Sequence, residues 1–566
     1  MPETSSQPES VYWTSRVAGG APASPAAGQA QFEGPASISR RRFLEAAGFT
    51  IAAASGCSRA PESTALPLPH QPAGLIPGQS RDYASTCAGC TASCGLLVGT
   101  RDGRPLKMEG MPEHPLSRGG LCAVGQALPL ELYDSRRLDG PLRGGQSVQW
   151  DDADTAILAR LDDIRREQGA VRLVTSTVTS PTLQASIDAF LGTFDDARQV
   201  VVDAVSSSAI LEAHERTHGA RLLPHYRFDR ARVIVSLGAD FLGTWISPVE
   251  FTAAWRTGRI PSEANRDMSW HCQIEGRMSL TGSKADRRYR VAPDEYGVLL
   301  SHVAVKIAEL AGQPKPGDLP TGLKISDSEL DDLVERMWAA RGECLVVSDS
   351  QEVPVQVLVN YVNHLLEAYG NTVDIERPSR QKQGNDTDAA RLVDELRAGS
   401  VSGLFVAGTD LAHCLPGWEA LRDAVQETSL VVSCAGRVDE LAAVSAFVCP
   451  DHHALESWLD AEPVSGLVSL SQPTLQPLKG TRSLLESLAI WSGEESASAY
   501  DILRGSWEER IVPRALQPVD GFVPFWDEAV HDGFVQVSPE SNGAGELEVD
   551  AVELQTAPGR ASDYLL

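Results

Sequence analysis

Residues 87–94 read CAGCTASC and residues 119–123 read GGLCA, so three cysteines follow the spacing C-x2-C-x3-C and a fourth stands farther along. Small residues fill the positions between the first three, and they let the backbone wrap tightly around a compact inorganic core. Four thiolates on such a loop suit a four-iron, four-sulfur cluster or a tetrahedral zinc ion, and disulfides are a third alternative. Thr91 excludes a c-type haem, because the haem motif C-x-x-C-H needs histidine there. The candidate ligands are Cys87, Cys90, Cys94 and Cys122.

Length and charge set the frame for this motif. With 566 residues the chain can hold several domains, and 42% hydrophobic residues is ordinary for a globular protein. The net charge of −27 argues against a nucleic-acid partner. Ten cysteines are too few for a disulfide scaffold of this size. Five of them are scattered singly and are expected to be buried apolar residues: Cys272, Cys344, Cys414, Cys434 and Cys449.

The N-terminal region is predicted to carry an export signal. Residues 39–44 read SRRRFL, and the weakly apolar run 46–54 follows, which is typical of a twin-arginine signal; an ordinary amphipathic helix start is the alternative. The run is too short to span a bilayer, and no later segment is long enough, so no transmembrane span is expected in the mature chain. The sequence ASGC ending at Cys57 resembles a lipoprotein cleavage site with alanine in place of the usual leucine, which leaves lipidation of Cys57 open.

This route exports folded proteins, which fits a cofactor inserted in the cytoplasm and favours the cluster over zinc. The expected location is the periplasmic, extracytoplasmic face of the membrane. The chain divides into an unstructured n-region and signal, a Pro-rich linker, a cysteine-bearing domain, a long α/β region and a polar tail. We place these parts at residues 1–57, 58–80, 81–142, 143–535 and 536–566.

The long region alternates helical and β-branched patterns. Helices are predicted near 153–166 and 183–193, a hairpin turns at Asp102-Gly103, and a helix covers 126–133. Apolar strands at 232–240 and 403–410 both end in Gly-x-Asp. These patterns predict two α/β domains with parallel sheets whose strand ends face a shared cleft. A glycine after a buried strand is weak evidence for nucleotide binding, because a structural turn also explains it.

Residues 85–142 resemble the N-terminal Fe4S4 domain of the molybdopterin oxidoreductases, the family of polysulfide, thiosulfate and DMSO reductases. Besides the cysteines, the strings that carry this resemblance are EGMPEHP at 109–115, RGGLC at 118–122, LYD at 132–134 and GPL at 140–142. The resemblance implies a DMSO reductase-like fold with a small Fe4S4 domain and two dinucleotide-binding-like α/β domains around a bis-pterin molybdenum cofactor. It also implies one 4Fe-4S cluster on the four cysteines.

Several positions depart from the family pattern. Asp240-Phe241 and Asp410-Leu411 replace the usual Asn-Pro, and acids at these turns would repel a pyrophosphate. Residues 293–296 lose a glycine, residues 449–458 replace a loop usually rich in glycine and asparagine, and Val124 stands where active enzymes carry a cation. No molybdenum ligand is assignable, although Ser206, Ser207 and Ser208 lie in the relevant region. The C-terminal β-barrel lid of the family is expected to be missing or vestigial. These departures make the molybdopterin cofactor doubtful.

A narrower likeness points to the molybdopterin-oxidoreductase-like subunit of alternative complex III and of menaquinone reductase complexes. It rests on Tyr12-Trp13, the late export signal, Ile76-Pro77-Gly78 and the strings at 241–248, 455–458 and 525–533. It implies an iron-sulfur subunit that transfers electrons within a quinone-linked membrane complex and needs no turnover of its own. The implied partners are a ferredoxin-like iron-sulfur subunit, a multihaem cytochrome c and polytopic membrane quinone-binding subunits.

Two alternatives stand beside this interpretation. One is an active molybdopterin-dependent oxidoreductase acting on a sulfur compound or a similar inorganic substrate.

The other concerns a second metal site, because adjacent histidines and nearby acids can converge on a metal. A loop with a capping aspartate is the simpler explanation, since adjacent histidines point apart on regular elements. The residues in question are Asp451, His452, His453 and Glu456.

Overall fold

The computed structural model describes residues 76, 78–261, 266–496, 498–548 and 552–555. The expected twin-arginine signal, Cys57, most of the 58–80 linker and the end of the expected tail lie outside the described residues. Residues 76, 78–82 and 101–103 belong to a small unit of their own, in which the Gly78 N–H donates to the Asp102 carboxylate at 2.9 Å. All the α/β structure belongs to the second unit.

The cysteine-bearing domain is built on a three-stranded sheet followed by one helix. Its elements are β1 (Ser80–Thr86), β2 (Gly95–Arg101), β3 (Arg104–Gly110) and α2 (Ala123–Leu132). The predicted hairpin is confirmed: Asp102 and Gly103 connect β2 to β3 with positive φ angles, as a tight turn requires. The predicted helix at 126–133 is also present and begins one turn earlier.

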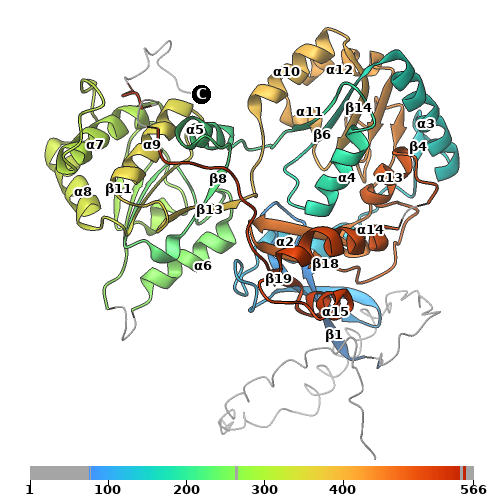
Figure 1. The fold of residues 1–566 in the computed structure, drawn as a ribbon, viewed down its shortest axis with the longest axis horizontal. Coiled ribbons are helices and arrows are strands. Elements are labelled where there is room, and N and C mark those ends of the chain that lie inside the picture. The colour runs from blue at the N-terminus through green and yellow to red at the C-terminus, as the bar shows by residue number, and fades with distance from the viewer. Residues whose placement is uncertain (1–75, 77, 262–265, 497, 549–551, 556–566) are drawn as a thin grey trace, which may run out of the picture. The chain divides into compact units, whose positions relative to one another are not determined.

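A seven-stranded sheet forms the first α/β domain. Its order is β5-β4-β16-β15-β14-β6-β7, with the five strands from β16 to β7 parallel and β4 and β5 antiparallel. Side chains alternate between the faces: Leu404 and Val406 pack toward α10 and α12, whereas Phe405 packs toward α3 and α13. Figure 1 shows the helices α3, α4, α10 and α12 around this sheet. The strands are β4 (Leu142–Arg143), β5 (Gln146–Ser147), β6 (Ala170–Thr175), β7 (Ala197–Val201), β14 (Val401–Ala407), β15 (Leu430–Ser433) and β16 (Phe447–Val448). The helices are α3 (Trp150–Glu167), α4 (Pro181–Leu191), α10 (Asp386–Arg397), α11 (Leu411–Cys414), α12 (Trp418–Glu427) and α13 (Leu484–Trp491).

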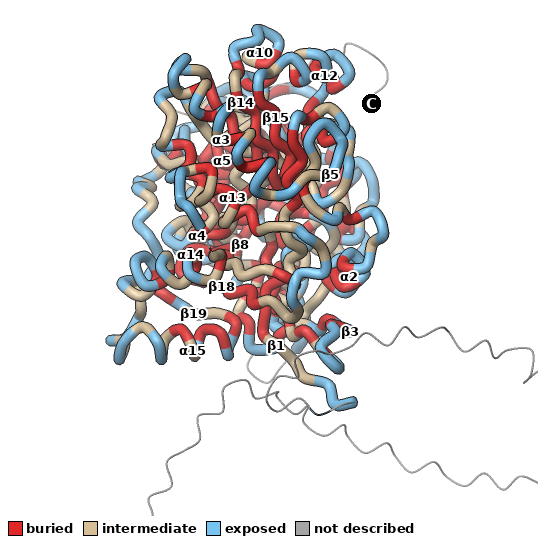
Figure 2. Tube along the Cα trace, turned by 90° about the vertical axis from the view of Figure 1, so that its right-hand side faces the viewer, coloured by how far each residue is buried: buried red, intermediate tan, exposed pale blue. Residues whose placement is uncertain are grey.

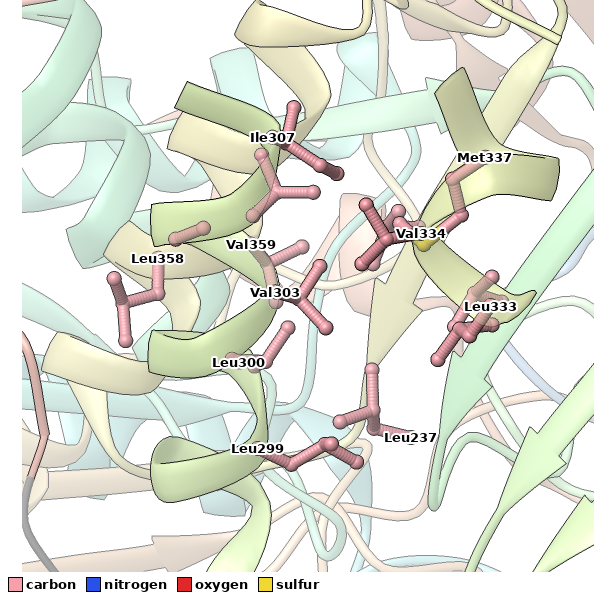
Figure 3. Close-up of a cluster of buried hydrophobic side chains, with 14 of the residues drawn as sticks. Leu237, Leu299, Leu300, Val303, Ile307, Leu333, Val334, Met337, Leu358 and Val359 are labelled. Atoms are coloured by element: carbon pink, nitrogen blue, oxygen red, sulfur yellow. The ribbon is translucent and has the colours of Figure 1, made fainter. Parts of the chain in front are cut away.

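A four-stranded, fully parallel sheet forms the second α/β domain, inserted between β7 and β14 in the sequence. Its order is β11-β10-β9-β12, from β9 (Val233–Leu237), β10 (Trp270–Ile274), β11 (Arg287–Tyr289) and β12 (Cys344–Ser348). Its helices are α5 (Ser208–His218), α6 (Pro248–Arg259), α7 (Tyr296–Leu310), α8 (Asp327–Ala339) and α9 (Val353–Leu365). Figure 3 shows part of its core, where Val303 of α7 faces Val334 and Leu333 of α8.

A five-stranded sheet, which the sequence patterns did not predict, joins distant parts of the chain. Its order is β19-β18-β17-β13-β8, with antiparallel neighbours. The strands are β8 (Leu223–Tyr226), β13 (Val373–Ser379), β17 (Leu459–Val464), β18 (Leu467–Ser471) and β19 (Phe534–Gln536). The helices α14 (Ala499–Ser506) and α15 (Phe522–Asp532) precede β19. Short 3-10 and π turns complete the chain: η1 (Phe228–Arg230), η2 (Gly282–Lys284), η3 (Pro293–Glu295), η4 (Ala454–Glu456), η5 (Trp507–Ile511) and η6 (Val512–Arg514).

Beyond β19 the described part of the expected tail packs on the second α/β domain. The Gly545 N–H donates to the His218 carbonyl at 2.8 Å, and the Gln555 N–H donates to Ser301 Oγ at 2.8 Å.

Buried residues concentrate along the central strands, including β14 and β15 (Figure 2). The parallel pairing within the seven-stranded and four-stranded sheets confirms the two predicted α/β domains with parallel sheets. Among the described helices, none has the length and apolar character needed to cross a membrane.

Candidate iron-sulfur centre

The first three cysteines lie on a tight loop between β1 and β2. Cys87 directly follows β1, and its N–H donates to the Cys94 carbonyl at 2.8 Å, one residue before β2 begins. Ser93 turns the chain with a φ of 48°. This hydrogen bond closes the base of the loop between β1 and β2. The first three thiols therefore lie on one short closed loop.

The fourth cysteine stands at the start of α2, where the helix meets the loop at close range. Cys122 is the residue before the helix. A Cβ on Gly125 would lie 2.3 Å from Leu121 Cδ1, in the segment that leads to Cys122, and a Cβ on Gly89 would lie 2.9 Å from Val124 Cγ1. The glycines are therefore needed for the close approach of helix and loop, as expected of the small residues in the motif.

The four thiols interact electrostatically. Burial raises the pKa of the Cys87 thiol to about 11, and the charges of Cys90 and Cys122 add to the increase. Burial also raises the pKa of Cys94, with contributions from the other three thiols. Buried thiolates that repel one another need a compensating positive charge, which iron supplies. The donor set thus fits a metal cluster.

Disulfides and a single zinc ion are the other two alternatives. None of the cysteines in the described part of the chain forms a disulfide. In a cubane cluster each thiolate binds a different iron, whereas a single zinc ion would take all four thiolates.

One side of this centre faces solvent. Cys87 and Cys94 are buried, Cys122 is half-buried and Cys90 is exposed. Many exposed residues of the loop and of α2 are small or apolar, and we call them the apolar face: Ala88, Gly89, Cys90, Ala123, Val124, Ala127 and Leu130. Val124 is 56% exposed. Gln126 and Glu131 of α2 are exposed as well, and the charge of Glu131 acts on Cys87.

The carboxyl edge of the four-stranded sheet is the place where a pterin diphosphate is expected. Gly238 directly follows β9 with a φ of 74°, but a Cβ on it would overlap the Asp349 carboxylate. A Cβ on Gly282 would likewise overlap the Glu275 carboxylate. The space that these glycines open is therefore occupied by anionic side chains of the chain itself. Burial, with the Glu275 charge adding, raises the pKa of Asp349 to about 6.

Asp240, one of the acids expected to repel a pyrophosphate, does not project into open space. Its Oδ1 accepts hydrogen bonds from the backbone N–H and the hydroxyl of Thr281, at 3.0 and 2.7 Å, and its carboxylate fills the space beside Gly243. In the seven-stranded domain, a Cβ on Gly384 would lie 3.1 Å from Asp203 Oδ2. These residues do not fit a pterin diphosphate, because like charges would face its phosphates.

The remaining candidate positions serve local structure. Residues 293–295 form a 3-10 turn into α7, Ser206 Oγ donates to Asp386 at 2.8 Å, and Asp410 accepts from the His413 N–H at 3.3 Å. The acids and histidines at 451–456 do not converge. Asp451 accepts from the Leu484 N–H at the start of α13, a helix other than the one expected, and Glu456 Oε2 binds Arg137 at 2.5 Å.

Comparisons with known proteins agree with this geometry. Residues 81–134 match the model of the molybdopterin oxidoreductase Fe4S4 domain. The chain is 32% identical over 101 residues to the probable oxidoreductase YoaE of Bacillus subtilis, covering 16% of this chain and 15% of that protein. It is 36% identical over 93 residues to a sulfite dehydrogenase subunit of Allochromatium vinosum, covering 15% of this chain and 10% of that protein. The sequence match thus spans a small part of each relative.

The fold is similar to that of acetylene hydratase from Pelobacter acetylenicus, with a TM-score of 0.56 and 13% identity over 73% of this chain and 69% of that chain. The fold is therefore the DMSO reductase-like α/β fold with an N-terminal Fe4S4 domain. Residues 81–134 are thus similar to the Fe4S4 domain of the molybdopterin oxidoreductases, which supports a 4Fe-4S cluster as the cofactor of this part of the chain.

Proposed function

We propose that this chain is the extracytoplasmic iron-sulfur, molybdopterin-oxidoreductase-like subunit of a membrane quinone-linked electron-transfer complex, and that it works without molybdenum. Its single 4Fe-4S cluster is bound by Cys87, Cys90, Cys94 and Cys122. Its task is electron transfer, not turnover of a substrate of its own.

The observation that carries this proposal is the contrast between the two candidate cofactor sites. All four thiols are present and interact with one another. By contrast, carboxylates fill the spaces over Gly238 and Gly282, where a phosphate would need close backbone approach. The residues that would bind the cluster are all present. At the expected pterin site, carboxylates of the chain itself occupy the space.

The apolar face supports electron exchange with a partner. A cluster ligand, Cys90, is itself exposed there, and Val124 replaces the cation that would connect the cluster to a pterin. We propose that the cluster exchanges electrons through this face with a ferredoxin-like iron-sulfur subunit, within a complex that also holds a multihaem cytochrome c and polytopic quinone-binding subunits.

An active molybdopterin-dependent oxidoreductase is the second candidate. The similarity to the sulfite dehydrogenase of Allochromatium vinosum favours it and would suggest an inorganic sulfur compound as substrate. That similarity covers 15% of this chain, so it does not reach most of the α/β region.

Metal analysis of the purified protein separates the two. We expect about four iron atoms and no molybdenum per chain. Molybdenum near one atom per chain would disprove the electron-transfer proposal, whereas iron near four without molybdenum would exclude the enzyme.

The location is tested separately. Replacing Arg40 and Arg41 by lysine should retain the protein in the cytoplasm. Unchanged export of this variant would refute the twin-arginine route.

A further inference from the structure

A buried acid–histidine pair lies between the cysteine loop and a cavity. His225 Nε2 is 2.6 Å from Glu250 Oε1, and the two side chains are only 14% and 7% exposed. Both line a cavity of about 190 Å³. The cavity therefore gives water a route to a pair that is otherwise enclosed by protein.

Polar contacts lead from this pair to the cysteine loop. Gln381 Nε2 is 3.4 Å from Glu250 Oε2 and donates to the Ala92 carbonyl at 3.4 Å, and Ala92 stands between Cys90 and Cys94. Gln381 is 1% exposed. The charge of Glu250 is also felt at the Cys94 thiol. A charge added at the cluster would therefore act directly on Glu250 across a poorly screened interior.

The other groups that face the pair define its charge. Asp374 lies opposite His225 in the β8–β13 ladder, and Arg377 of the same strand lines the cavity. Asp229 binds Arg227 at 2.9 Å and lies 3.7 Å from Arg118. From the cysteine-bearing domain, His114 also feels Glu250, but burial lowers the pKa of His114 to about 4, so it stays neutral near pH 7. His225 is the imidazole that both lines the cavity and contacts Glu250.

We propose that the His225–Glu250 pair takes up one proton from the cavity when the cluster is reduced, so that the centre performs proton-coupled electron transfer. This inference rests on the proposed cluster. When neutral, His225 donates its Nε2–H to the Glu250 carboxylate. With a cluster held by the four cysteines, one electron from a one-electron reductant would be matched by one proton, which passes from bulk solvent through the cavity to His225 Nδ1. The pair would then be an imidazolium and a carboxylate.

The reason is electrostatic. An electron on the cluster makes the surroundings of Glu250 more negative, which favours the protonated pair. By linkage, protonation favours reduction by the same free energy. The reduction potential must then fall as the pH rises. Uptake of one proton per electron changes the equilibrium constant of reduction at most tenfold per pH unit, which corresponds to a fall of about 59 mV for a one-electron couple.

The test is a redox titration of the iron-loaded full chain with dithionite between pH 6 and 9, followed by the cluster's electron paramagnetic resonance signal. We expect the wild-type potential to fall with pH and the His225→Gln variant to have a constant potential. Glutamine keeps a donor for Glu250 but takes up no proton. Glu250→Gln should also remove the pH dependence and should raise the potential, because a negative charge is lost.

His413→Gln is the matched control, because this exposed histidine pairs with Asp410 on the seven-stranded domain. It should keep the wild-type slope. A wild-type potential that does not change with pH, or a slope retained in His225→Gln with full iron content, would overturn this inference alone. Protein without iron or a cluster signal would overturn the proposed function as well.

Discussion

Asp349 fills the space above Gly238, so that a side chain on this glycine would overlap the Asp349 carboxylate. Gly238 directly follows β9, and Asp349 directly follows β12, the neighbouring strand. In a parallel sheet, strand ends of this kind form the crevice where dinucleotide-like ligands bind. The half-buried Asp349 carboxylate occupies this position.

We predict that Asp349→Asn stabilises the protein at alkaline pH. Burial raises the pKa of Asp349 to about 6, above the unfolded value of about 3.9, so the folded state binds the proton more tightly. This contribution to stability is present below about pH 4 and is lost as the pH rises through 6. The asparagine should gain about 1–3 kcal/mol at pH 8 and nothing near pH 4.

Urea unfolding at the two pH values measures this difference, with the exposed Asp520→Asn as control. An equal effect of Asp349→Asn at pH 4 and pH 8 would show that the carboxylate is not held in a strained, charged state.

The ligand assignment predicts a sharp contrast between cysteines. Cys94→Ser should lower the iron content well below four per chain and abolish the broad visible absorption of the cluster, because one corner iron loses its thiolate. Cys272→Ala removes a cysteine that is just as buried but lies in β10, and it should leave the iron content unchanged. Iron analysis and absorption spectra of both variants decide. Equal iron in the two proteins would refute the assignment.

Close packing around the cysteine loop predicts that Gly110 tolerates no side chain. A Cβ there would overlap the backbone carbonyl of Gly119, which cannot move without displacing the segment that leads to Cys122. We expect Gly110→Ala to cost about 3 kcal/mol or more and to reduce iron content. Gly436 has open space around it, so Gly436→Ala is the control with little effect. Thermal unfolding that is identical for both variants would contradict the packing argument.

The sequence could predict features that depend on local pattern. The thiol spacing, the hairpin at Asp102 and the apolar strands ending at Gly238 and Gly408 all involve neighbouring residues. The five-stranded sheet could not be predicted, because β17 carries a proline and two acids. The fold buries these acids against distant partners: Asp460 accepts from Trp507 Nε1 at 2.9 Å.

The candidate site shows the same limit. Glu250 and His225 are single residues without a motif, and only the packing of α6 against β8 brings them together. The carboxylate over Gly238 was not predictable either, since residue 349 is more than a hundred positions away. The only sequence signal for an acidic crevice was the acids at strand ends. Asp240 is one of them, but its carboxylate accepts a hydrogen bond from Thr281.

A buried ion pair predicts a large loss of stability when one partner is neutralised. Arg137 follows α2, and Glu456 binds it at 2.5 Å with almost no exposure of either side chain. Burial alone would raise the pKa of Glu456, but hydrogen bonds from Arg137 and the backbone outweigh it and lower the pKa. This stability is present above the unfolded pKa and is lost as the pH falls through the lower folded pKa. Glu456→Gln should cost roughly 3 kcal/mol at pH 7.

The exposed pair of Asp163 and Arg166 provides the control, because Asp163→Asn should cost less than about 0.5 kcal/mol. Unfolding of both variants at pH 7 tests the contrast. Similar small losses would mean that the Arg137–Glu456 pair contributes no more than a surface pair.

Finally, Val124→Lys restores the cation that the family usually places between cluster and pterin. Val124 contacts the loop at Gly89 but is half exposed, so solvent screens the added charge. We expect the cluster potential to rise by about 40 mV, equivalent to roughly 1 kcal/mol, without any gain of molybdenum. Val124→Leu keeps the apolar face and should leave the potential unchanged. A variant that acquired molybdenum would show that this one residue, not the acidic strand ends, excludes the pterin.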